Sequence, residues 1–435
     1  MEIPKLTKWL GVLASMVAFP IASLCTLILI SDAKFSDFFA ERISILKDRP
    51  SNITKDIVVD ATGISYCGGI RTLVGNLIKM MATKCPDWRF IMLVEDHGRR
   101  FPELLPLGNV TFIVTKISPN MMTLFIRNFL DFITLKLFHD KITQLCFYNT
   151  LCLDRKCDLF FDPYGEFHPN DFEIPKITLI HDLAYLDYPA CKTKEVIRYN
   201  RAVSGPMIAS SRKIITISNF SKQRIMKWYH VPEEKIHVIY PCFAKRLPDI
   251  KDVCIIESIL RKYNLQKNKY LIYVSSFWPH KNHQRLISAF EKFVASSKNT
   301  WGKLAIVGEF NALRHRDFFK NEMISRGLAE RVVFTHHVSD VELSVLLKHS
   351  RALIFPSLYE GFGMPVAEAT AASVPVLCSG IGSLREASGG SAIYFNPYDM
   401  GAISCAVAIG MSGRVYSKSA IPPAKPSTGF PSDLH

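Results

Sequence analysis

The chain has 435 residues, of which 48% are hydrophobic and 21% charged, and its formal net charge is +14. This length suits two domains of ordinary size, and the composition is that of a globular protein rather than a disordered one. The positive charge fits nucleic acid, an anionic membrane surface or anionic substrates. Nucleic acid is the weakest of these, because the chain has no basic low-complexity tail, zinc-finger spacing or RNA-binding signature.

Residues 9–30 form a run without a charged side chain, preceded by Lys5 and Lys8. The run can cross a bilayer core, which needs roughly twenty apolar residues, and is longer than the roughly 7–15 residues of a signal-peptide core. We therefore expect residues 1–34 to be a single-pass membrane anchor and residues 35–54 to be a stem. Basic residues on both sides leave the orientation open. Residues 124–141 are either a second, interfacial membrane contact or an ordinary core helix.

The eleven cysteines are odd in number and form no C-x-x-C pair. Because they are scattered among apparent core strands and helices, we expect free thiols in a reducing compartment and no zinc site. A reducing compartment favours a cytoplasmic location for the body of the protein.

Strands alternate with helices after the stem. Apolar runs predict strands at residues 56–61, 90–94, 110–114, 159–161, 177–180, 214–217 and 236–240. The turn at Gly68 and Gly69 leads into a helix whose apolar residues recur with a period of 3.6. This alternation is typical of a parallel α/β sheet, so we predict a Rossmann-like domain over residues 55–245.

A second series of strands follows a charge-rich linker at residues 246–268. Its apolar runs lie at residues 271–274, 304–307, 332–334, 352–355, 374–377 and 392–395, and they predict a second α/β domain over residues 269–405. Ligands bind beyond the carboxyl ends of strands in such sheets, so we expect the two domains to face each other across a cleft. Residues 406–435 are expected to be a disordered tail.

Glu360 and Glu368 enclose a Gly-Phe-Gly-Met-Pro sequence directly after one predicted strand. Pro365 suits the first turn of a helix, so Glu360 should lie in a loop and Glu368 inside the helix. Helix-start amides attract an anion such as a phosphate, and Gly361 and Gly363 let backbone approach it closely. The alternative is an ordinary glycine turn before a helix with one exposed glutamate.

This pattern resembles the E-x7-E motif of glycosyltransferase family 4, the group 1 glycosyltransferases. The resemblance implies the GT-B architecture of two Rossmann-like domains. It also implies that Glu368 holds the nucleotide ribose, that Glu360 lies beside the donor sugar, and that the intervening Gly361, Phe362 and Gly363 contact the donor.

Other segments resemble the family at single positions. Lys281 takes the place of the lysine that neutralises the leaving diphosphate. Many relatives also have an arginine several residues earlier, where this chain has Ser275 and Ser276, so this second cation is either missing or supplied by His280 or by another segment of the chain. His181 matches a histidine that contacts the donor sugar, and the turn at Gly68 and Gly69 matches a Gly-Gly turn that presents amides to a phosphate.

Other positions near these segments also bear on the site. His336 stands where relatives usually have glycine, which would reshape its loop. Ser383 and Glu386 form either a capping box or a substrate contact. Arg71, after the Gly-Gly turn, is a candidate cation for the same phosphate.

The resemblance implies a metal-independent, retaining hexosyltransferase that moves a sugar such as mannose from a nucleotide-diphosphate sugar to a hydroxyl of a lipid-linked or polysaccharide acceptor. No cofactor is expected beyond this co-substrate, and the chain has no D-x-D pair to bridge a metal to a diphosphate. The expected partners are the nucleotide sugar, a glycan acceptor and the membrane. Alternatives are a catalytically silent membrane-associated nucleotide-sugar-binding or scaffold protein and, third, a nucleic-acid-binding protein.

Overall fold

The computed structural model describes residues 49–62, 64, 69–94, 101–114, 157–164, 174–241, 247–296, 302–309, 319 and 321–413. They form two compact units, and each is described by itself. The first unit runs to His181 and also contains Arg198–Thr216 and Ile225–Ile239. The second unit contains Asp182–Ile197, Ile217–Arg224 and the chain from Tyr240 onward.

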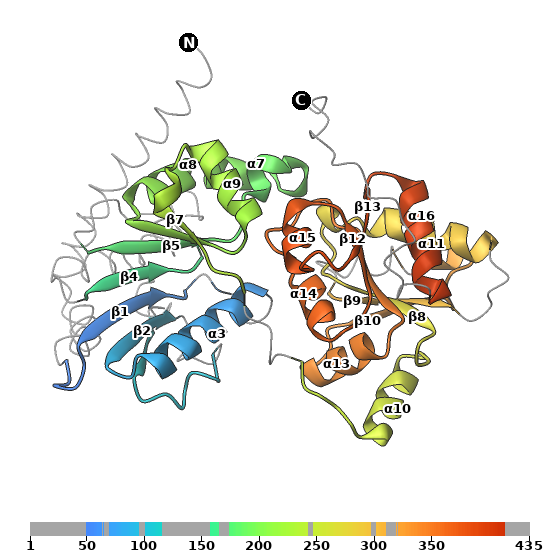
Figure 1. Ribbon diagram of the computed structural model, residues 1–435, viewed down its shortest axis with the longest axis horizontal. Helices are drawn as coiled ribbons and strands as arrows, with labels where there is room; N and C mark the ends of the chain where they lie inside the picture. Colours follow the sequence, from blue (N-terminus) through green and yellow to red (C-terminus); the bar gives the residue numbers. More distant parts are fainter. Residues whose placement is uncertain are drawn as a thin grey trace, which may run out of the picture. The chain divides into compact units, whose positions relative to one another are not determined.

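The first unit is built on a seven-stranded sheet in the order β3-β2-β1-β4-β5-β6-β7 (Figure 1). Its strands are β1 (Lys55–Asp60), β2 (Trp88–Val94), β3 (Val110–Val114), β4 (Leu159–Asp162), β5 (Lys176–Ile180), β6 (Lys213–Thr216) and β7 (Ile236–Val238). All neighbouring strands are parallel, with Val58 opposite Ile91 and Phe160. Val58, Val59 and Phe90 have no exposed surface, which explains the continuous apolar runs.

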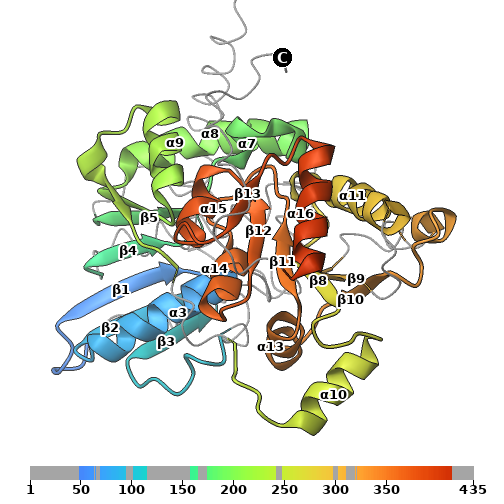
Figure 2. The ribbon, with the colours of Figure 1, turned by 45° about the vertical axis from the view of Figure 1, so that its right-hand side comes forward.

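Helices connect these strands. They are α3 (Gly69–Lys84), α7 (Ala184–Asp187), α8 (Lys194–Ser210) and α9 (Asn219–Tyr229), with short 3-10 turns η1 (Pro189–Cys191) and η2 (Glu233–Lys235). Of these, α7, η1 and the starts of α8 and α9 belong to the second unit. α3 packs on β2 and buries Val74 and Ile78 one turn apart (Figure 2). The 3.6-residue period therefore identified the face that this helix turns to the sheet.

The second unit is built on a six-stranded parallel sheet in the order β10-β9-β8-β11-β12-β13. Its strands are β8 (Tyr270–Val274), β9 (Lys303–Val307), β10 (Val332–His336), β11 (Ala352–Phe355), β12 (Val376–Ser379) and β13 (Ile393–Phe395). β8, β9 and β11 form the centre of the core, where Ile272, Ala305 and Ile354 have no exposed surface.

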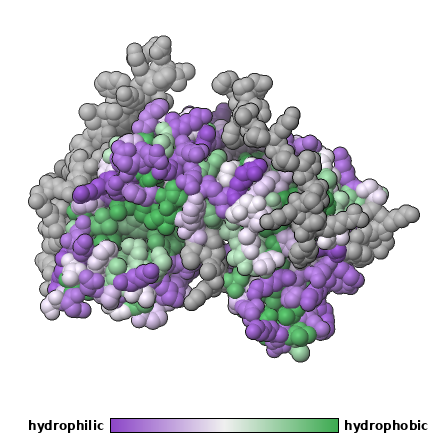
Figure 3. Space-filling model, in the orientation of Figure 1, coloured by the Kyte–Doolittle hydropathy of each residue, from purple (hydrophilic) through white to green (hydrophobic). Residues whose placement is uncertain are grey.

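Side chains cap the starts of some helices of this unit. Its helices are α10 (Val253–Lys262), α11 (His283–Ser296), α13 (Asp340–Lys348), α14 (Met364–Ala371), α15 (Gly382–Ala387) and α16 (Met400–Ser412), with the 3-10 turn η3 (Pro279–Lys281). Asp252 and Asp399 cap α10 and α16, and Ser339 forms a capping box with Glu342. α10 lies in the segment expected to be the linker; Val253 is exposed on it, and Figure 3 shows apolar surface over this helix.

Tyr359 joins the segment Asp182–Ile197 to the rest of the second unit. Its hydroxyl donates to Asp187 Oδ2 at 3.2 Å and accepts from the Leu183 amide at 3.3 Å. Arg224, from the other short segment, donates to the same Asp187 carboxylate at 2.7 Å. Burial raises the pKa of the Tyr359 hydroxyl, so this hydroxyl stays neutral.

The C-terminal helix extends further than the sequence indicated. We expected a disordered tail from residue 406, but α16 continues to Ser412 and packs against α11, β8, β11 and β13. Ala406, Val407 and Met411 are buried there. The Ala- and Ile-rich sequence of this helix ends before the stretch rich in Pro and Ser, and its apolar side chains gain free energy by covering the sheet.

Several expectations fall outside the described residues: the anchor at residues 1–34, most of the stem, the segment 124–141 and Gly68. Among the residues that the structure does describe, none of the helices is both long enough and apolar enough to span a bilayer. The anchor and the domain limits stay predictions. The cysteines of the described ranges are free thiols: Cys85, Cys157, Cys191, Cys254, Cys378 and Cys405.

Candidate active site

The strand order of the second unit reverses between β8 and β11. β9 and β10 follow on one side of this point, and β12 and β13 on the other. Doubly wound sheets bind ligands at such a switch point, beyond the carboxyl ends of the strands. The loop after β8 carries Lys281 and the loop after β11 carries Glu360, so the fold brings two predicted site residues to the switch point.

Lys281 and Glu360 are paired with each other. Lys281 Nζ lies 2.5 Å from Glu360 Oε1, and the two side chains are only 17% and 11% exposed. The ammonium also lies 5.9 Å from the centre of the Phe355 ring. We expected a phosphate partner for the lysine and a sugar partner for the glutamate. The pair instead balances its charges internally, in partly desolvated surroundings where the attraction between them is strong.

Hydrogen bonds fix the backbone around Lys281. The Tyr273 hydroxyl, from β8, donates to the Lys281 carbonyl at 2.6 Å. Asn282 adopts a left-handed backbone with φ of 63°, and its Nδ2 donates to the carbonyls of Pro356 and Pro397 at 3.0 and 2.9 Å. Asn282 therefore ties the loop after β8 to those after β11 and β13. Sequence reasoning gave it no role; the available signal was an asparagine, which tolerates this backbone, directly before a helix.

The strand–loop–helix arrangement around the E-x7-E motif is as predicted. Glu360 lies in the loop, Pro365 in the first turn of α14, and Glu368 inside the helix. Gly363 has φ of 100°, and a Cβ there would collide with Leu384 Cδ2, so only glycine fits. Glu368 is 4% exposed, which rules out the alternative of a single exposed glutamate. Gly361 and Phe362 are buried as well.

Two histidines flank Lys281, and both are neutral at physiological pH. Burial, and after it the charge of Lys281, lowers the pKa of His280 and of His283 to about 3. At this pKa the imidazole of His280 carries no positive charge near pH 7, and a role for it as the second cation beside a diphosphate stays a prediction. His283 is 5% exposed, and its ring stacks on Phe277 with the ring centres 4.1 Å apart.

The end of β10 and the loop after β9 also contain residues with a left-handed or otherwise unusual backbone. His336 has φ of 60°, a left-handed conformation that favours glycine, and the register of β10 shifts between Phe334 and His336. The backbone of His336, at a position where relatives usually have glycine, is therefore strained. Gly308, after β9, has φ of 153°, and a Cβ there would collide with the Ser275 carbonyl. We did not select Gly308 from the sequence, although a glycine directly after a strand was the signal.

The first unit positions the remaining predicted residues. His181 follows β5, is half-buried, and its Nε2 lies 2.8 Å from the Pro163 carbonyl oxygen, which fixes the orientation of the ring. Gly69 is exposed at the start of α3. Arg71 Nη2 lies 2.5 Å from Glu103 Oε2, so the guanidinium already has a carboxylate partner.

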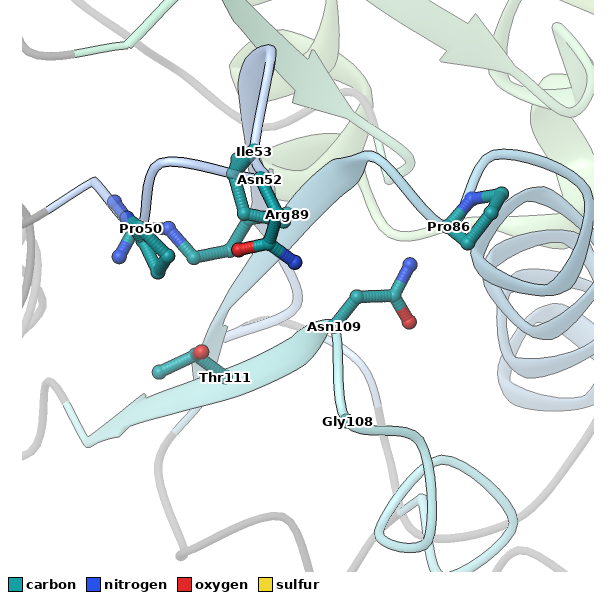
Figure 4. Close-up of a pocket in the computed structure, with 8 residues that line it drawn as sticks. All are labelled: Pro50, Asn52, Ile53, Pro86, Arg89, Gly108, Asn109 and Thr111. Carbon is teal, nitrogen blue, oxygen red and sulfur yellow. The ribbon is translucent and has the colours of Figure 1, made fainter.

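A separate recess of about 570 Å³ lies in the first unit at the amino ends of β1, β2 and β3 (Figure 4). Arg89 lines it and donates to both oxygens of Asp56 at 2.7 and 3.0 Å. The recess includes none of the predicted site residues. Within the described ranges, no group of three or more His, Cys, Asp or Glu side chains is arranged to hold a metal ion.

Comparison with known proteins agrees with this geometry. The architecture of two parallel α/β units resembles that of solved GT-B-like transferases. The solved structure of Anabaena Alr3699/HepE in complex with UDP and glucose covers 82% of this chain and 89% of its own, with a TM-score of 0.60 at 15% identity. WaaG, a glycosyltransferase involved in lipopolysaccharide biosynthesis, gives 0.60 at 14% identity over 82% of this chain and 90% of its own.

Sequence comparison points to the same class of protein. Residues 256–411 match the family model of glycosyl transferases group 1, so this segment of the chain is similar to that family. O-antigen chain mannosyltransferase B of Escherichia coli is 27% identical over 55% of this chain and 63% of its own length. O-antigen chain mannosyltransferase RfbU of Salmonella typhimurium is 30% identical over 51% of this chain and 56% of its own. The match thus spans somewhat over half the length of these relatives.

Proposed function

We propose that this chain is a retaining glycosyltransferase that moves a sugar from a nucleotide-diphosphate sugar to a hydroxyl acceptor. The main support for the proposal is that Lys281 contacts Glu360 of the E-x7-E loop at the switch point of the sheet, within the segment that matches the group 1 family model. Mannose is the favoured sugar and a polysaccharide or lipid-linked glycan the favoured acceptor, because two relatives are named O-antigen chain mannosyltransferases.

The proposed reaction needs charge stabilisation more than a strong base. The bond between the anomeric carbon and the diphosphate oxygen breaks, and a bond from that carbon to the acceptor oxygen forms on the same face. The acceptor proton passes to the leaving phosphate, so the products are a glycoside and a nucleoside diphosphate. Lys281 neutralises charge that grows on the diphosphate in the transition state, which is where such an interaction accelerates a reaction.

The other residues have binding roles in this proposal. Glu368 accepts hydrogen bonds from the ribose hydroxyls, Glu360 orients the donor sugar, and the amides of Gly361 and Gly363 face the diphosphate. His181 contacts the far side of the sugar. Glu360 is paired with Lys281 in the structure. A bound diphosphate therefore either displaces Glu360 from the lysine or interacts with the lysine alongside it.

A panel of UDP- and GDP-sugars, tested for hydrolysis and for transfer with the purified protein, examines the proposal directly. Glu368→Ala should weaken donor and free nucleotide alike, because a hydrogen bond to a charged group contributes roughly 1.5–3 kcal/mol, or about ten- to a hundredfold in affinity. Glu360→Ala should spare nucleotide affinity and weaken use of the sugar. Equal nucleotide affinity in wild type and folded Glu368→Ala would refute the assignment of this motif.

A catalytically silent nucleotide-sugar-binding protein is the second candidate. The loop after β8 has Ser275 and Ser276 where many relatives have an arginine, and His280 is neutral. Lys281 is then the single cation of that loop. Tight binding of a nucleotide sugar without transfer or hydrolysis, across a panel of glycan acceptors, would decide for this candidate.

We also propose that residues 1–34 anchor the protein in a membrane, with the catalytic body in the cytoplasm. The support is the uncharged run at residues 9–30, the free thiols of the described ranges and a nucleotide-sugar donor. Membrane fractions washed with alkaline carbonate should retain the full chain and release a chain that lacks residues 1–34. Release of the full chain in the same wash would argue against an anchor.

A further inference from the structure

Serine hydroxyls from outside the E-x7-E loop hold two of its carbonyl groups. The Ser383 hydroxyl, from the first turn of α15, donates to the Glu360 carbonyl at 2.8 Å. The Ser218 hydroxyl donates to the Gly361 carbonyl at 2.6 Å, and the Ser221 hydroxyl lies 3.3 Å from the same oxygen. We call Ser218, Ser221 and Ser383 the serine clamp.

The clamp is fully enclosed by the protein. All three serines have 0% exposed surface, so each hydroxyl needs an internal partner to offset the loss of water. Ser218 and Ser221 belong to the short segment Ile217–Arg224, which is part of the second unit. Side chains from the starts of α9 and α15 therefore hold the backbone of the loop in place.

The clamp also decides where the loop amides point. In a trans peptide, the carbonyl of one residue and the N–H of the next point in opposite directions. Because Ser383 holds the Glu360 carbonyl, the Gly361 N–H is directed away from α15. Gly361 is buried, yet within the described ranges its N–H has no acceptor, and the same holds for Gly363. Buried amides are nearly always paired, so these two point to a ligand with acceptor oxygens.

Glu386 secures the part of the clamp that comes from α9. One carboxylate oxygen accepts from the Asn219 amide at 2.7 Å and the other from the Phe220 amide at 2.8 Å. The Tyr240 hydroxyl adds a bond at 3.0 Å. A carboxylate at the first turn of a helix is favoured by both the free amides and the helix dipole. This residue caps α9 from another element and does not form the capping box in α15, which was one of the two interpretations of the sequence.

We propose that the serine clamp is a positioning device that aims the Gly361 amide at the diphosphate of the nucleotide-sugar donor. Ser383 sets the orientation of the Glu360–Gly361 peptide, and Ser218 with Ser221 sets that of the next peptide. Glu386 acts one step further away, by fixing the turn that carries Ser218 and Ser221. This inference rests on the proposed function, because the donor diphosphate is the ligand of the loop.

The test measures nucleotide affinity of the full-length protein by calorimetry with UDP and GDP, and uses competition by the nucleoside of the same base. Ser383→Ala and the double variant Ser218→Ala/Ser221→Ala should weaken the diphosphate about three- to tenfold, the range for losing an ordinary hydrogen bond. Affinity for the nucleoside should not change, since it carries no phosphate. Ser344→Ala is the matched control: Ser344 is also 0% exposed and donates to the Pro248 carbonyl at 2.6 Å.

The possible outcomes distinguish the positioning role of the serine clamp from the proposed function. Wild type that binds a nucleoside diphosphate, with Ser383→Ala and the double variant binding it equally well, overturns the positioning role and leaves the proposed function intact. Equal losses for diphosphate and nucleoside, or a loss in Ser344→Ala as large as in Ser383→Ala, mean a general loss of structure and also overturn it. Wild type that binds neither UDP nor GDP overturns the proposed function, and the inference falls with it.

Discussion

The ion pair between Lys281 and Glu360 links two residues that the proposed chemistry uses separately. Each carboxylate or ammonium in a partly desolvated place needs a counter-charge. In this structure the Lys281 ammonium and the Glu360 carboxylate are each other's counter-charge, with Nζ and Oε1 2.5 Å apart. Changing either residue therefore affects the folded protein as well as the substrate, and kinetic effects of single variants contain both contributions.

A double-mutant cycle separates these contributions. Lys281→Met and Glu360→Gln should each lower the free energy of unfolding by about 1–3 kcal/mol, and the double variant by about 1–2 kcal/mol less than the sum. Urea denaturation of the four proteins gives the values. The Lys262–Glu342 pair, with Lys262 62% exposed, is the control and should show smaller coupling because water screens it. Additive losses at Lys281 and Glu360 would contradict the pairing.

His336 carries backbone strain that a single substitution should relieve. Its φ of 60° is unfavourable for a residue with a Cβ. Since glycine adopts this conformation freely but loses more entropy on folding, His336→Gly should raise the free energy of unfolding by about 0.5–1 kcal/mol. The neighbouring His337→Gly has no such strain to relieve and should not stabilise. Thermal unfolding of both variants decides, and destabilisation by His336→Gly would refute the strain.

His283 should make the protein less stable in mild acid. Its pKa is lowered to about 3 when folded, against about 6.5 in the unfolded chain. Above pH 6.5 it is neutral in both states. As the pH falls below 6.5, the unfolded chain binds a proton that the folded protein does not, so the free energy of unfolding falls by up to about 1.4 kcal/mol per pH unit until pH 3.

Replacing that ring gives the measurement. His283→Phe keeps the stacking on Phe277 and removes the titration, so its loss of stability from pH 7 to pH 5 should be about 2 kcal/mol smaller than in wild type. Urea denaturation at both pH values provides the comparison. An identical loss in the two proteins would mean that His283 is not the titrating group.

At the scale of elements, each strand of both sheets could be predicted, because strands buried on both faces are continuous apolar runs between polar segments. Their ends were less accurate. The run at residues 374–377 predicted a strand that in fact begins at Val376, since Pro375 has no N–H to donate to a neighbouring strand. Position and type of an element follow from local sequence, whereas its ends depend on individual hydrogen bonds.

The residues of the candidate site also differ in how far the sequence predicts them. Glu360, Glu368 and Lys281 could be selected because a local pattern carries them. The roles of Asn282 and of the serine clamp could not be predicted, since they consist of hydrogen bonds to carbonyls of other elements. Glu386 shows the difference most clearly: the local spacing predicts a capping box in α15, but a helix start from a distant segment takes both of its oxygens.

A substitution at Gly363 tests whether the strand–loop–helix unit requires glycine at this position. Gly363→Ala combines a positive φ with a collision against Leu384, and should lower the free energy of unfolding by about 2–4 kcal/mol. Gly390→Ala is the control, because Gly390 has φ of 76° but no atom near the added Cβ, and should cost about 1 kcal/mol. Denaturation of both variants measures the difference. Equal costs would mean that Leu384 yields without resistance.

At the scale of the whole molecule, the proposed chemistry requires no metal ion. The diphosphate is to be neutralised by Lys281 and loop amides, and the chain has no D-x-D pair. We therefore expect transferase activity to persist in excess EDTA and not to rise on adding magnesium or manganese. Radiolabelled sugar transfer in the presence and absence of chelator measures this. Activity abolished by EDTA and restored by either metal would overturn the proposed catalytic arrangement.

The way the second unit is assembled has a practical consequence for dissecting the protein. A fragment that begins at Tyr240 would lack Asp182–Ile197 and Ile217–Arg224. It would expose Tyr359, take away the Asp187 partner of its hydroxyl, and leave the Gly361 carbonyl without its serine donors. Shortened versions for crystallography or ligand screening therefore have to keep these two segments, because no single cut in the chain yields the second unit intact.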